Sequence, residues 1–222
     1  MSFYTTHLSF RSGLALLTAA LLMPLPTSAF ELPLSDEALR DAYFLGQRRD
    51  DTTARFLEAY RQYLVAPKSG PHVFAVELFT PFALAVEASR NHGGSYSAQE
   101  ARQDYRANGD SFRVGVHVVY TNTYNPGIVK GQNRVPSQTS PGQDFQVLLK
   151  QNGKAVESQN TRYENTSTSG RGSRGGSGSR LTGFIIWLEY DALRLTSSEA
   201  TVEVDTPDGQ HLNTSFDLVR LR

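Results

Sequence analysis

The hydrophobic pattern of the chain changes its period at Ser111, and this change constrains the fold more than any other feature of the sequence. Before it, apolar residues recur at helical spacing over 36–47 and 51–64. After it, apolar and polar residues alternate over 111–121, as in a strand with one buried face. The sequence therefore predicts an α+β fold. An N-terminal helical layer is expected to pack on a mostly antiparallel β-sheet or sandwich of roughly six to seven strands.

Residues 30–110 carry the signals of helix starts. Ser35 precedes two acidic residues, and this order suits a helix N-terminus, where a hydroxyl caps free amides and negative charge is stabilised. Ser97 and Glu100 have the spacing of a capping box. A third, short helix is therefore expected to run to about Ala107.

One strand is expected within this helical layer. Val73–Phe79 is rich in β-branched and aromatic residues, which favour strands. Residues 80–90 have two interpretations, because Thr80-Pro81 can begin a helix or bend an edge strand. The alternation of apolar residues over this segment favours the strand.

The region 111–222 is predicted to be antiparallel β-structure. Asn152-Gly153 is the strongest hairpin signal, with a return strand over about 154–163. Residues 181–190 are apolar on both faces, which indicates a central strand covered on both sides. A last hairpin turns at 207–209. If these strands are successive neighbours, the connections 122–143, 167–180 and 207–209 share one edge of the sheet.

Residues 167–180 form a segment of low complexity, rich in Gly, Ser and Arg. Such a composition buries little apolar surface, so a mobile loop is expected there. Gly170, Gly172 and Gly175 match a dinucleotide-binding pattern, but the glycines and serines that follow are poor helix formers. We therefore expect no nucleotide cofactor.

Residues 1–29 have the organisation of a secretory signal peptide. Arg11 is the only charged residue among them, and it precedes a short apolar run and the small residues Thr27 and Ala29. The alternative is a membrane anchor, but the apolar run is about half of the ~20 residues needed to span a bilayer. We therefore expect cleavage after Ala29 and a soluble chain, Phe30–Arg222, in the periplasm or outside the cell.

The composition excludes several classes of function. The chain contains no cysteine, so disulfides, thiol nucleophiles and thiolate metal sites are absent. After cleavage, 21 basic and 22 acidic residues remain. This near balance argues against nucleic acid as a partner.

Several isolated residues could be catalytic or bind a ligand, but a structural role explains each of them better. The four histidines after the leader have no metal-ligand spacing, although His117 and His211 would be neighbours if their strands were adjacent. Glu189 could be a buried general acid but lies at a strand end, and Trp187 could stack on a sugar but fits a core position. The spacing of Asp205 and Asp208 could indicate a calcium site, but it is equally that of a hairpin turn. We predict no catalytic residue, no cofactor and no metal.

The charged loops give one candidate binding site. The three connections expected at one edge carry five basic residues against a single acid, Asp208. Such an edge attracts polyanions, so an anionic polysaccharide, a lipid phosphate or an acidic protein is the expected partner. We call these residues the basic rim: Lys130, Arg134, Arg171, Arg174 and Arg180.

Three functions remain open from the sequence. The basic rim favours an exported, non-catalytic binding module. The first alternative is a structural component of an envelope assembly, joined to its partner through the helical N-terminal layer or an open sheet edge. The second is a hydrolase whose site is assembled from distant residues. A deep pocket would favour the hydrolase, a shallow charged edge the binding module and an uncovered strand the assembly component.

Overall fold

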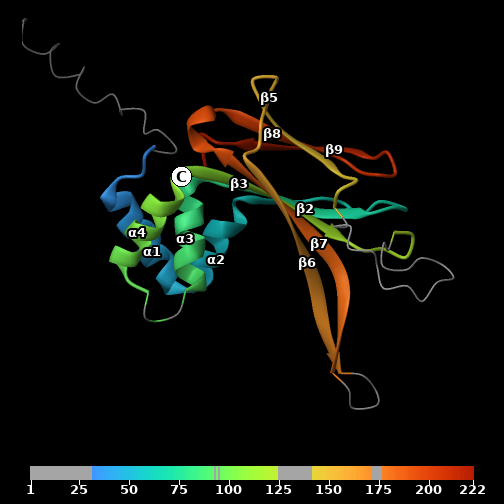
Figure 1. Cartoon of the computed structure of the whole chain (residues 1–222), viewed down its shortest axis with the longest axis horizontal. Helices are drawn as coiled ribbons and strands as arrows, with labels where there is room; N and C mark the ends of the chain where they lie inside the picture. Colours follow the sequence, from blue (N-terminus) through green and yellow to red (C-terminus); the bar gives the residue numbers. More distant parts are fainter. Residues whose placement is uncertain (1–31, 93, 95, 125–141, 172–176) are drawn as a thin grey trace, which may run out of the picture.

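The computed structural model describes residues 32–92, 94, 96–124, 142–171 and 177–222, and within them the α+β prediction is confirmed (Figure 1). The helices are α1 (Asp36–Arg48), α2 (Asp51–Glu58), α3 (Pro81–Asn91) and α4 (Ala98–Asn108). The strands are β1 (Arg61–Tyr63), β2 (His72–Phe79), β3 (Ser111–Val119), β4 (Gln146–Gln151), β5 (Lys154–Val156), β6 (Asn160–Arg171), β7 (Ser177–Asp191), β8 (Glu199–Asp205) and β9 (His211–Asp217). None of the helices in these ranges has the length and hydrophobicity needed to cross a bilayer.

The predicted helix starts are confirmed by their caps. The Ser35 hydroxyl accepts a hydrogen bond from the amide of Ala38 at 3.2 Å. At α4, the Ser97 hydroxyl accepts from the Glu100 amide while the Glu100 carboxylate accepts from the Ser97 amide, which completes the capping box. These local side-chain interactions fix where each helix begins.

The prediction of one helix over 51–64 is wrong at its C-terminal end. Helix α2 ends at Glu58, and Arg61–Tyr63 form the edge strand β1. The carbonyl of Tyr60 accepts from the amide of Leu78, and the amide of Leu64 donates to the carbonyl of Phe74. Pairing with β2 therefore replaces the helical hydrogen bonds that the apolar spacing alone would have favoured.

The interpretation of residues 80–90 as a strand is also wrong. Thr80 caps helix α3 by accepting from the amide of Ala83, and Pro81 occupies the first turn. Phe82 and Val86 then pack with the buried side of α1. Helix α1 approaches closely at Gly46, where a methyl group would lie 2.4 Å from the carbonyl oxygen of Val86. Burial against α1 decides for the helix.

Both predicted tight turns are present. Asn152 and Gly153 have φ values of 52° and 72° between β4 and β5, and Gly209 has a φ of 86° between β8 and β9. However, the expected return strand over 154–163 is not continuous. Strand β5 ends at Val156, and the chain passes to the other sheet before β6 begins.

The strands from Ser111 onward are only partly successive neighbours, which corrects the expected topology: β4–β5, β6–β7 and β8–β9 pair, but β3 pairs with β7 and β4 with β8. One sheet has the order β1-β2-β3-β7-β6 and the other β5-β4-β8-β9, with every pairing antiparallel. Strand β7 is a central strand, as predicted, and it joins β3 rather than β8. Core residues of both strands, such as Val114 and Ile186, face the other sheet, so β3 and β7 lie in the buried middle of the sandwich.

The two sheets face each other and enclose the main hydrophobic core. A smaller cluster holds α1 and α3 together, and Figure 1 shows the helices gathered at one end of the sandwich. Phe56 and Leu57 of α2 pack against both clusters. The main core includes Val76, Leu78, Val114, Val116, Leu149, Phe184, Ile186, Val202, Val204 and Phe216.

The loop expected over 167–180 is largely a continuation of two strands. Ser167 pairs with Leu181, and pairing continues to Arg171 opposite Ser177, after a register shift between Thr166 and Ser167. The backbone ladder satisfies these amides and carbonyls regardless of the small side chains, which explains why composition was misleading. Figure 1 shows the β6–β7 hairpin projecting from the sandwich. Residues 172–176 lie outside the described residues.

Candidate functional site

The basic rim is only partly within the described residues. Arg171 ends β6, and Arg180 lies on β7 opposite Thr168, so these two belong to one hairpin. Lys130, Arg134 and Arg174 lie outside the described residues. The structure therefore brings two rim positions together by backbone pairing and gives no arrangement for the other three.

The neighbouring connections meet near the start of β2. The amide of Gly70 donates to the Thr123 hydroxyl at 2.8 Å, and the Thr121 hydroxyl donates to the carbonyl of Gly70 at 2.7 Å. The side chain of Gln210, beside the β8–β9 turn, donates to the carbonyl of Pro71 at 3.4 Å. The ends of β3 and of the β8–β9 hairpin are thus linked through this segment, although β3 and β8 belong to different sheets.

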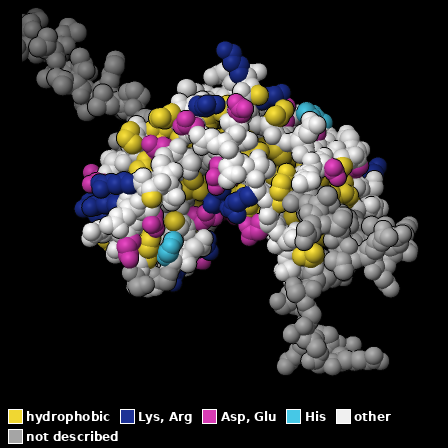
Figure 2. Space-filling view, in the orientation of Figure 1, with side chains coloured by type: hydrophobic (Ala, Val, Ile, Leu, Met, Phe, Trp, Pro, Cys, Tyr) yellow, Lys and Arg dark blue, Asp and Glu magenta, His cyan; other side chains and the backbone are white. Residues whose placement is uncertain are grey.

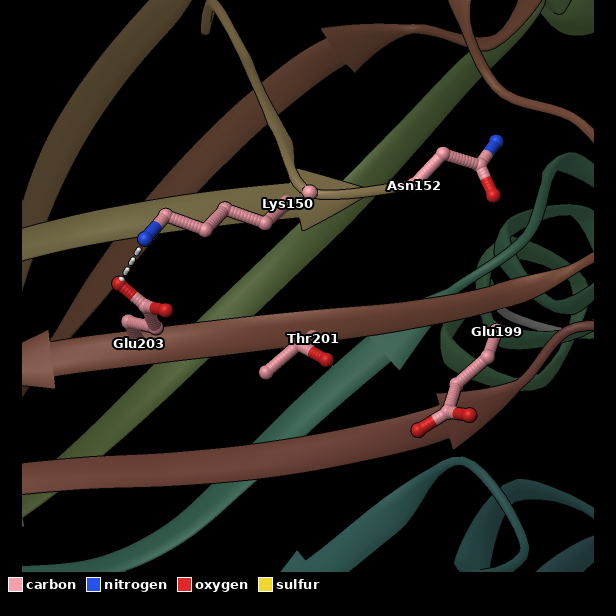
Figure 3. A pocket seen from close by; sticks show the side chains of 6 residues that line it. Lys150, Asn152, Glu199, Thr201 and Glu203 are labelled. Carbon is pink, nitrogen blue, oxygen red and sulfur yellow. Dashed lines mark ion pairs between the residues drawn. The ribbon is translucent and has the colours of Figure 1, made fainter.

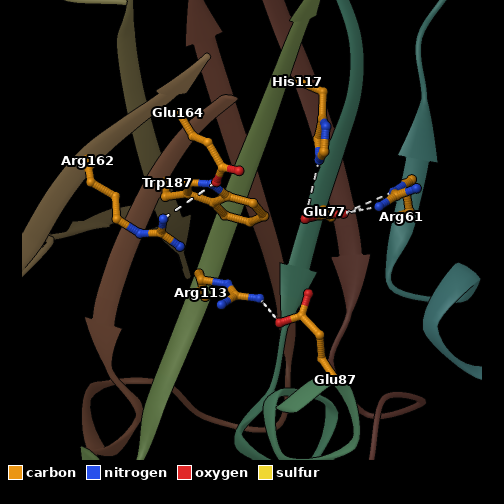
Figure 4. A network of polar contacts seen from close by, with 8 residues as sticks. All are labelled: Arg61, Glu77, Glu87, Arg113, His117, Arg162, Glu164 and Trp187. Atoms are coloured by element: carbon orange, nitrogen blue, oxygen red, sulfur yellow. Dashed lines mark hydrogen bonds and ion pairs between the residues drawn. The ribbon is translucent and has the colours of Figure 1, made fainter. Parts of the chain in front are cut away.

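The outer face of the five-stranded sheet, which points away from the other sheet, carries a polar network. Its residues alternate along the strands with core residues, and the strand register aligns them in rows. Figure 4 shows this network. One row across the five strands contains Arg61, Glu77, Gly115, Trp187 and Arg162, and the flanking rows contribute Arg113, His117 and Glu164.

Glu77 is the buried centre of one half of the network. Its side chain is only 1% exposed, and its Oε2 accepts from Nε and Nη2 of Arg61 at 2.9 and 2.6 Å. Nε2 of His117 lies 3.2 Å from the other carboxylate oxygen. Burial raises the pKa of Glu77, but the contacts with His117 and Arg61 outweigh burial and hold the pKa below its ordinary value. The carboxylate is therefore kept ionised by two partners.

Trp187 is the centre of the other half. Its ring is 7% exposed, and Nε1 donates to Oε2 of Glu164 at 2.8 Å. The guanidinium groups of Arg113 and Arg162 lie 4.6 and 5.2 Å from the ring centroid, within cation–π range. The predicted burial is confirmed, but these contacts place the ring on the outer face instead of in the sandwich core.

Gly115 makes this arrangement of Trp187 and Glu77 sterically possible. A methyl group at Gly115 would lie 2.5 Å from Cζ3 of Trp187 and 2.9 Å from Cγ of Glu77. Both distances are shorter than real carbon contacts. The row therefore requires glycine on β3, so that the two side chains can approach each other across the strand.

Helix α3 adds an ion pair at the edge of the network. Glu87 pairs with Arg113, whose guanidinium also lies 5.5 Å from the ring of Phe79. Nε of Arg113 has no hydrogen-bond partner among the described residues. Figure 2 shows a hollow between the helices and the β6–β7 hairpin, with basic and acidic side chains gathered at its upper wall. Since each guanidinium has a carboxylate close by, the outer face combines polar groups with little net charge.

The other candidates of the sequence analysis have structural roles. The expectation that His117 and His211 could be neighbours is wrong, because β3 and β9 belong to different sheets. His211 instead contacts Asp205 at 2.5 Å across its hairpin. Glu189 lies opposite Arg113 and accepts from the Asn160 amide group at 3.4 Å. In the described ranges, no group of three or more His, Asp or Glu side chains could hold a metal ion.

Asp208 belongs to the turn between β8 and β9. Its Oδ2 accepts from Nε2 of Gln210 at 2.8 Å, and its other carboxylate oxygen accepts from the Thr206 hydroxyl. Burial raises the pKa of Asp208, but these side-chain hydrogen bonds and the backbone hydrogen bonds outweigh burial and hold the pKa below its ordinary value. These hydrogen bonds give Asp208 a structural role in the turn.

A second surface feature lies on the outer face of the four-stranded sheet. It is an open groove of about 490 Å³, in which Nζ of Lys150 lies 2.6 Å from Oε2 of Glu203 (Figure 3). The Asn152-Gly153 turn forms one wall, and Glu199 and Thr201 complete the lining. The groove is open, and the charge of Lys150 is balanced by Glu203. Both features distinguish it from a deep catalytic pocket.

Four residues of the network were not predicted from the sequence to belong to a site: Arg61, Glu77, Arg113 and Arg162. One signal was available, because Glu77 is a charged residue inside the apolar run Val73–Phe79. Its partners come from strands far apart in sequence. No protein-family model matches the chain, and no curated protein sequence is significantly similar to it.

Proposed function

We propose that the chain is an exported, non-catalytic module that binds an anionic polysaccharide through the β6–β7 hairpin. The charge of this hairpin is the observation on which the proposal depends. Residues 167–180 contain Arg171, Arg174 and Arg180 and no acidic residue. Because β6 and β7 pair as far as Arg171 opposite Ser177, Arg171 and Arg180 belong to a projecting hairpin instead of a loop that folds back on the sandwich.

The spacing along the hairpin supports a polymeric ligand. Arg180 pairs with Thr168, three residues before Arg171, and a strand rises about 3.3 Å per residue, so these positions are about 10 Å apart along the hairpin. A linear polyanion presents charges at intervals and can contact several such positions at once. A single lipid phosphate can contact only one of these positions, which makes it the weaker alternative. An acidic protein is the other alternative partner.

Export is the second part of the proposal. It is supported by the order of residues in 1–29, with a basic flank, a short apolar run and a small-residue exit. The periplasm or the cell exterior would then be the compartment. Acidic polysaccharides at the cell surface would be accessible to the hairpin in either place.

Salt-dependent binding to an immobilised acidic polysaccharide tests the ligand. We expect the wild-type chain to bind at low ionic strength and to dissociate as salt screens the arginines. The triple variant R171Q/R174Q/R180Q should lose this binding. The matched control R40Q/R55Q/R220Q removes the same charge from exposed positions elsewhere and should bind as the wild type does.

Three outcomes contradict the proposal. The wild type does not bind the polysaccharide at any salt concentration, the control variant loses binding as strongly as the hairpin variant, or the chain binds only vesicles of an anionic phospholipid. The last outcome would assign the hairpin to lipid phosphate.

A second candidate function, a structural component of an envelope assembly, is favoured by the unpaired edge of β6. This strand is the last of its sheet in the described residues and is twelve residues long. Open edges of this length are templates for strand addition. The hydrolase alternative stays a prediction.

A further inference from the structure

Strand β6 presents the longest open edge of the two sheets in the described residues. The other outermost strands are β1 and β5, with three residues each, and β9, with seven. Proteins usually protect such edges with proline, lysine or a covering segment. Strand β6 contains neither proline nor lysine, and its sequence is rich in threonine, which favours strands.

The regular part of this edge has Tyr163 at its centre. A register shift follows Thr166, so the segment of β6 with uninterrupted register runs from Asn160 to Thr166. Tyr163 faces the core side, opposite Ile186, yet its side chain is 36% exposed at the open edge. A neighbouring strand would cover it.

The two charged residues of this segment flank Tyr163 symmetrically. Arg162 and Glu164 both lie on the outer face, where Nη1 of the arginine is 3.6 Å from Oε2 of the glutamate. Both side chains are about half exposed. The order along the strand is therefore basic residue, tyrosine, acidic residue. When a second copy runs antiparallel to the first, the basic residue of each copy lies opposite the acidic residue of the other.

We propose that β6 pairs with β6 of a second copy of this chain, antiparallel and around a two-fold axis at Tyr163. In this register Arg162 lies opposite Glu164 of the second copy, and Glu164 lies opposite Arg162 of the second copy. The two tyrosines lie opposite each other on the core side. Directly opposed charges of opposite sign and aromatic pairs are stabilising in antiparallel sheets.

The charges also select this register against its neighbours. A slip that centres the pair on Arg162 places two arginines directly opposite each other, and a slip that centres it on Glu164 places two glutamates opposite each other. Like charges in such positions are destabilising. A register that differs by one residue places an inward-facing residue of one copy opposite an outward-facing residue of the other. The core sides of the two copies would then no longer match. The pairing joins two five-stranded sheets into one continuous sheet.

Charge exchange between two variants tests the pairing. The full sequence is expressed for export, purified, and studied by sedimentation velocity over a range of concentrations. The wild type is expected to form dimers as concentration rises. R162E and E164R should each be monomeric at the same concentrations, because each places like charges opposite one another in its own dimer. An equimolar mixture of the two should recover a dimer, since both opposed pairs become attractive in the mixed species.

A matched control and the variant Y163P sharpen this test. R55E reverses one charge on the exposed surface of α2 and should dimerise as the wild type does. Y163P removes an amide at the centre of the edge and should abolish the dimer. Circular dichroism shows whether each variant is folded, and the recovery in the mixture answers the same question for the charge variants.

The proposal is overturned if the wild type remains monomeric at its highest soluble concentration. It is also overturned if R162E and E164R dimerise as the wild type does, or if their mixture contains only monomers. Polysaccharide binding is measured separately and depends on the distal hairpin, so either proposal can fail while the other holds.

Discussion

Replacement of Glu77 by glutamine tests whether the outer face is held together by its buried carboxylate. Glutamine keeps the shape of the side chain but removes the negative charge that Arg61 and His117 share. Because the side chain is 1% exposed, water cannot substitute for the lost charge at that position. The variant should therefore fold and be less stable than the wild type.

The magnitude follows from the contacts that are lost. Hydrogen bonds to charged groups contribute about 1.5–3 kcal/mol, and breaking a buried ion pair by removing one partner costs about 3–5 kcal/mol. The side chain of Arg61 is 32% exposed and can turn toward water, which reduces this cost. We expect the free energy of unfolding to fall by about 2 kcal/mol at neutral pH.

The same carboxylate gives the effect a defined pH dependence. The pKa of Glu77 in the folded chain lies below its ordinary value of 4.5, because the contacts with His117 and Arg61 outweigh burial. Its contribution to stability is therefore fully present above the pKa of the unfolded chain. That contribution is lost as the pH falls through the lowered pKa of the folded chain. The difference between wild type and Glu77→Gln should shrink in acid.

Urea unfolding followed by tryptophan fluorescence measures this difference. Trp187 is the single tryptophan of the chain and lies in the same network, so its emission reports on the outer face directly. Glu58→Gln, at an exposed position of α2, is the control and should change stability by less than about 0.5 kcal/mol. A Glu77 variant as stable as this control at neutral pH, or a difference that persists unchanged in acid, would refute the reasoning.

Two further predictions concern the steric basis of the network and the processing of the chain. Gly115→Ala places a methyl group 2.5 Å from Cζ3 of Trp187, so we expect a loss of about 1–3 kcal/mol and an altered near-ultraviolet circular dichroism spectrum of the tryptophan. Gly94→Ala is the control, because Gly94 is exposed and no atom lies within 4 Å of a methyl group added there. An unchanged spectrum of Gly115→Ala would contradict the crowding argument. Expression of the full sequence for export, followed by N-terminal sequencing, should give Phe30 as the first residue. A protein that retains Met1 would contradict the proposed cleavage.

Features that depend on adjacent residues could be predicted from the sequence. The caps at Ser35 and Ser97 and the turn at Asn152-Gly153 each depend on residues within four positions of one another. The two-residue alternation after Ser111 likewise predicted β-structure, because side chains alternate between the faces of any strand. These predictions needed no knowledge of which strands pair.

Predictions that required distant partners failed. The alternation over 80–90 fits a strand as well as a helix, and only burial of Phe82 and Val86 against α1 decides for α3. The glycine and serine content of 167–180 indicated a loop, yet pairing between β6 and β7 extends the hairpin to Arg171 and Ser177. In both cases long-range contacts outweighed a weak local preference.

The sequence by itself determined the α+β class, the starts of the helices capped by Ser35 and Ser97, and the tight turns. Only the tertiary structure decided which strands are neighbours, and with them the network around Glu77 and Trp187. Arg61, Glu77, Gly115, Arg162 and Trp187 lie on five different strands and meet because the order β1-β2-β3-β7-β6 aligns them in one row. The physical reason is that turns and caps are satisfied within a few residues. A strand, in contrast, leaves its hydrogen-bonding groups and its two faces to be satisfied by whichever distant segment best covers them.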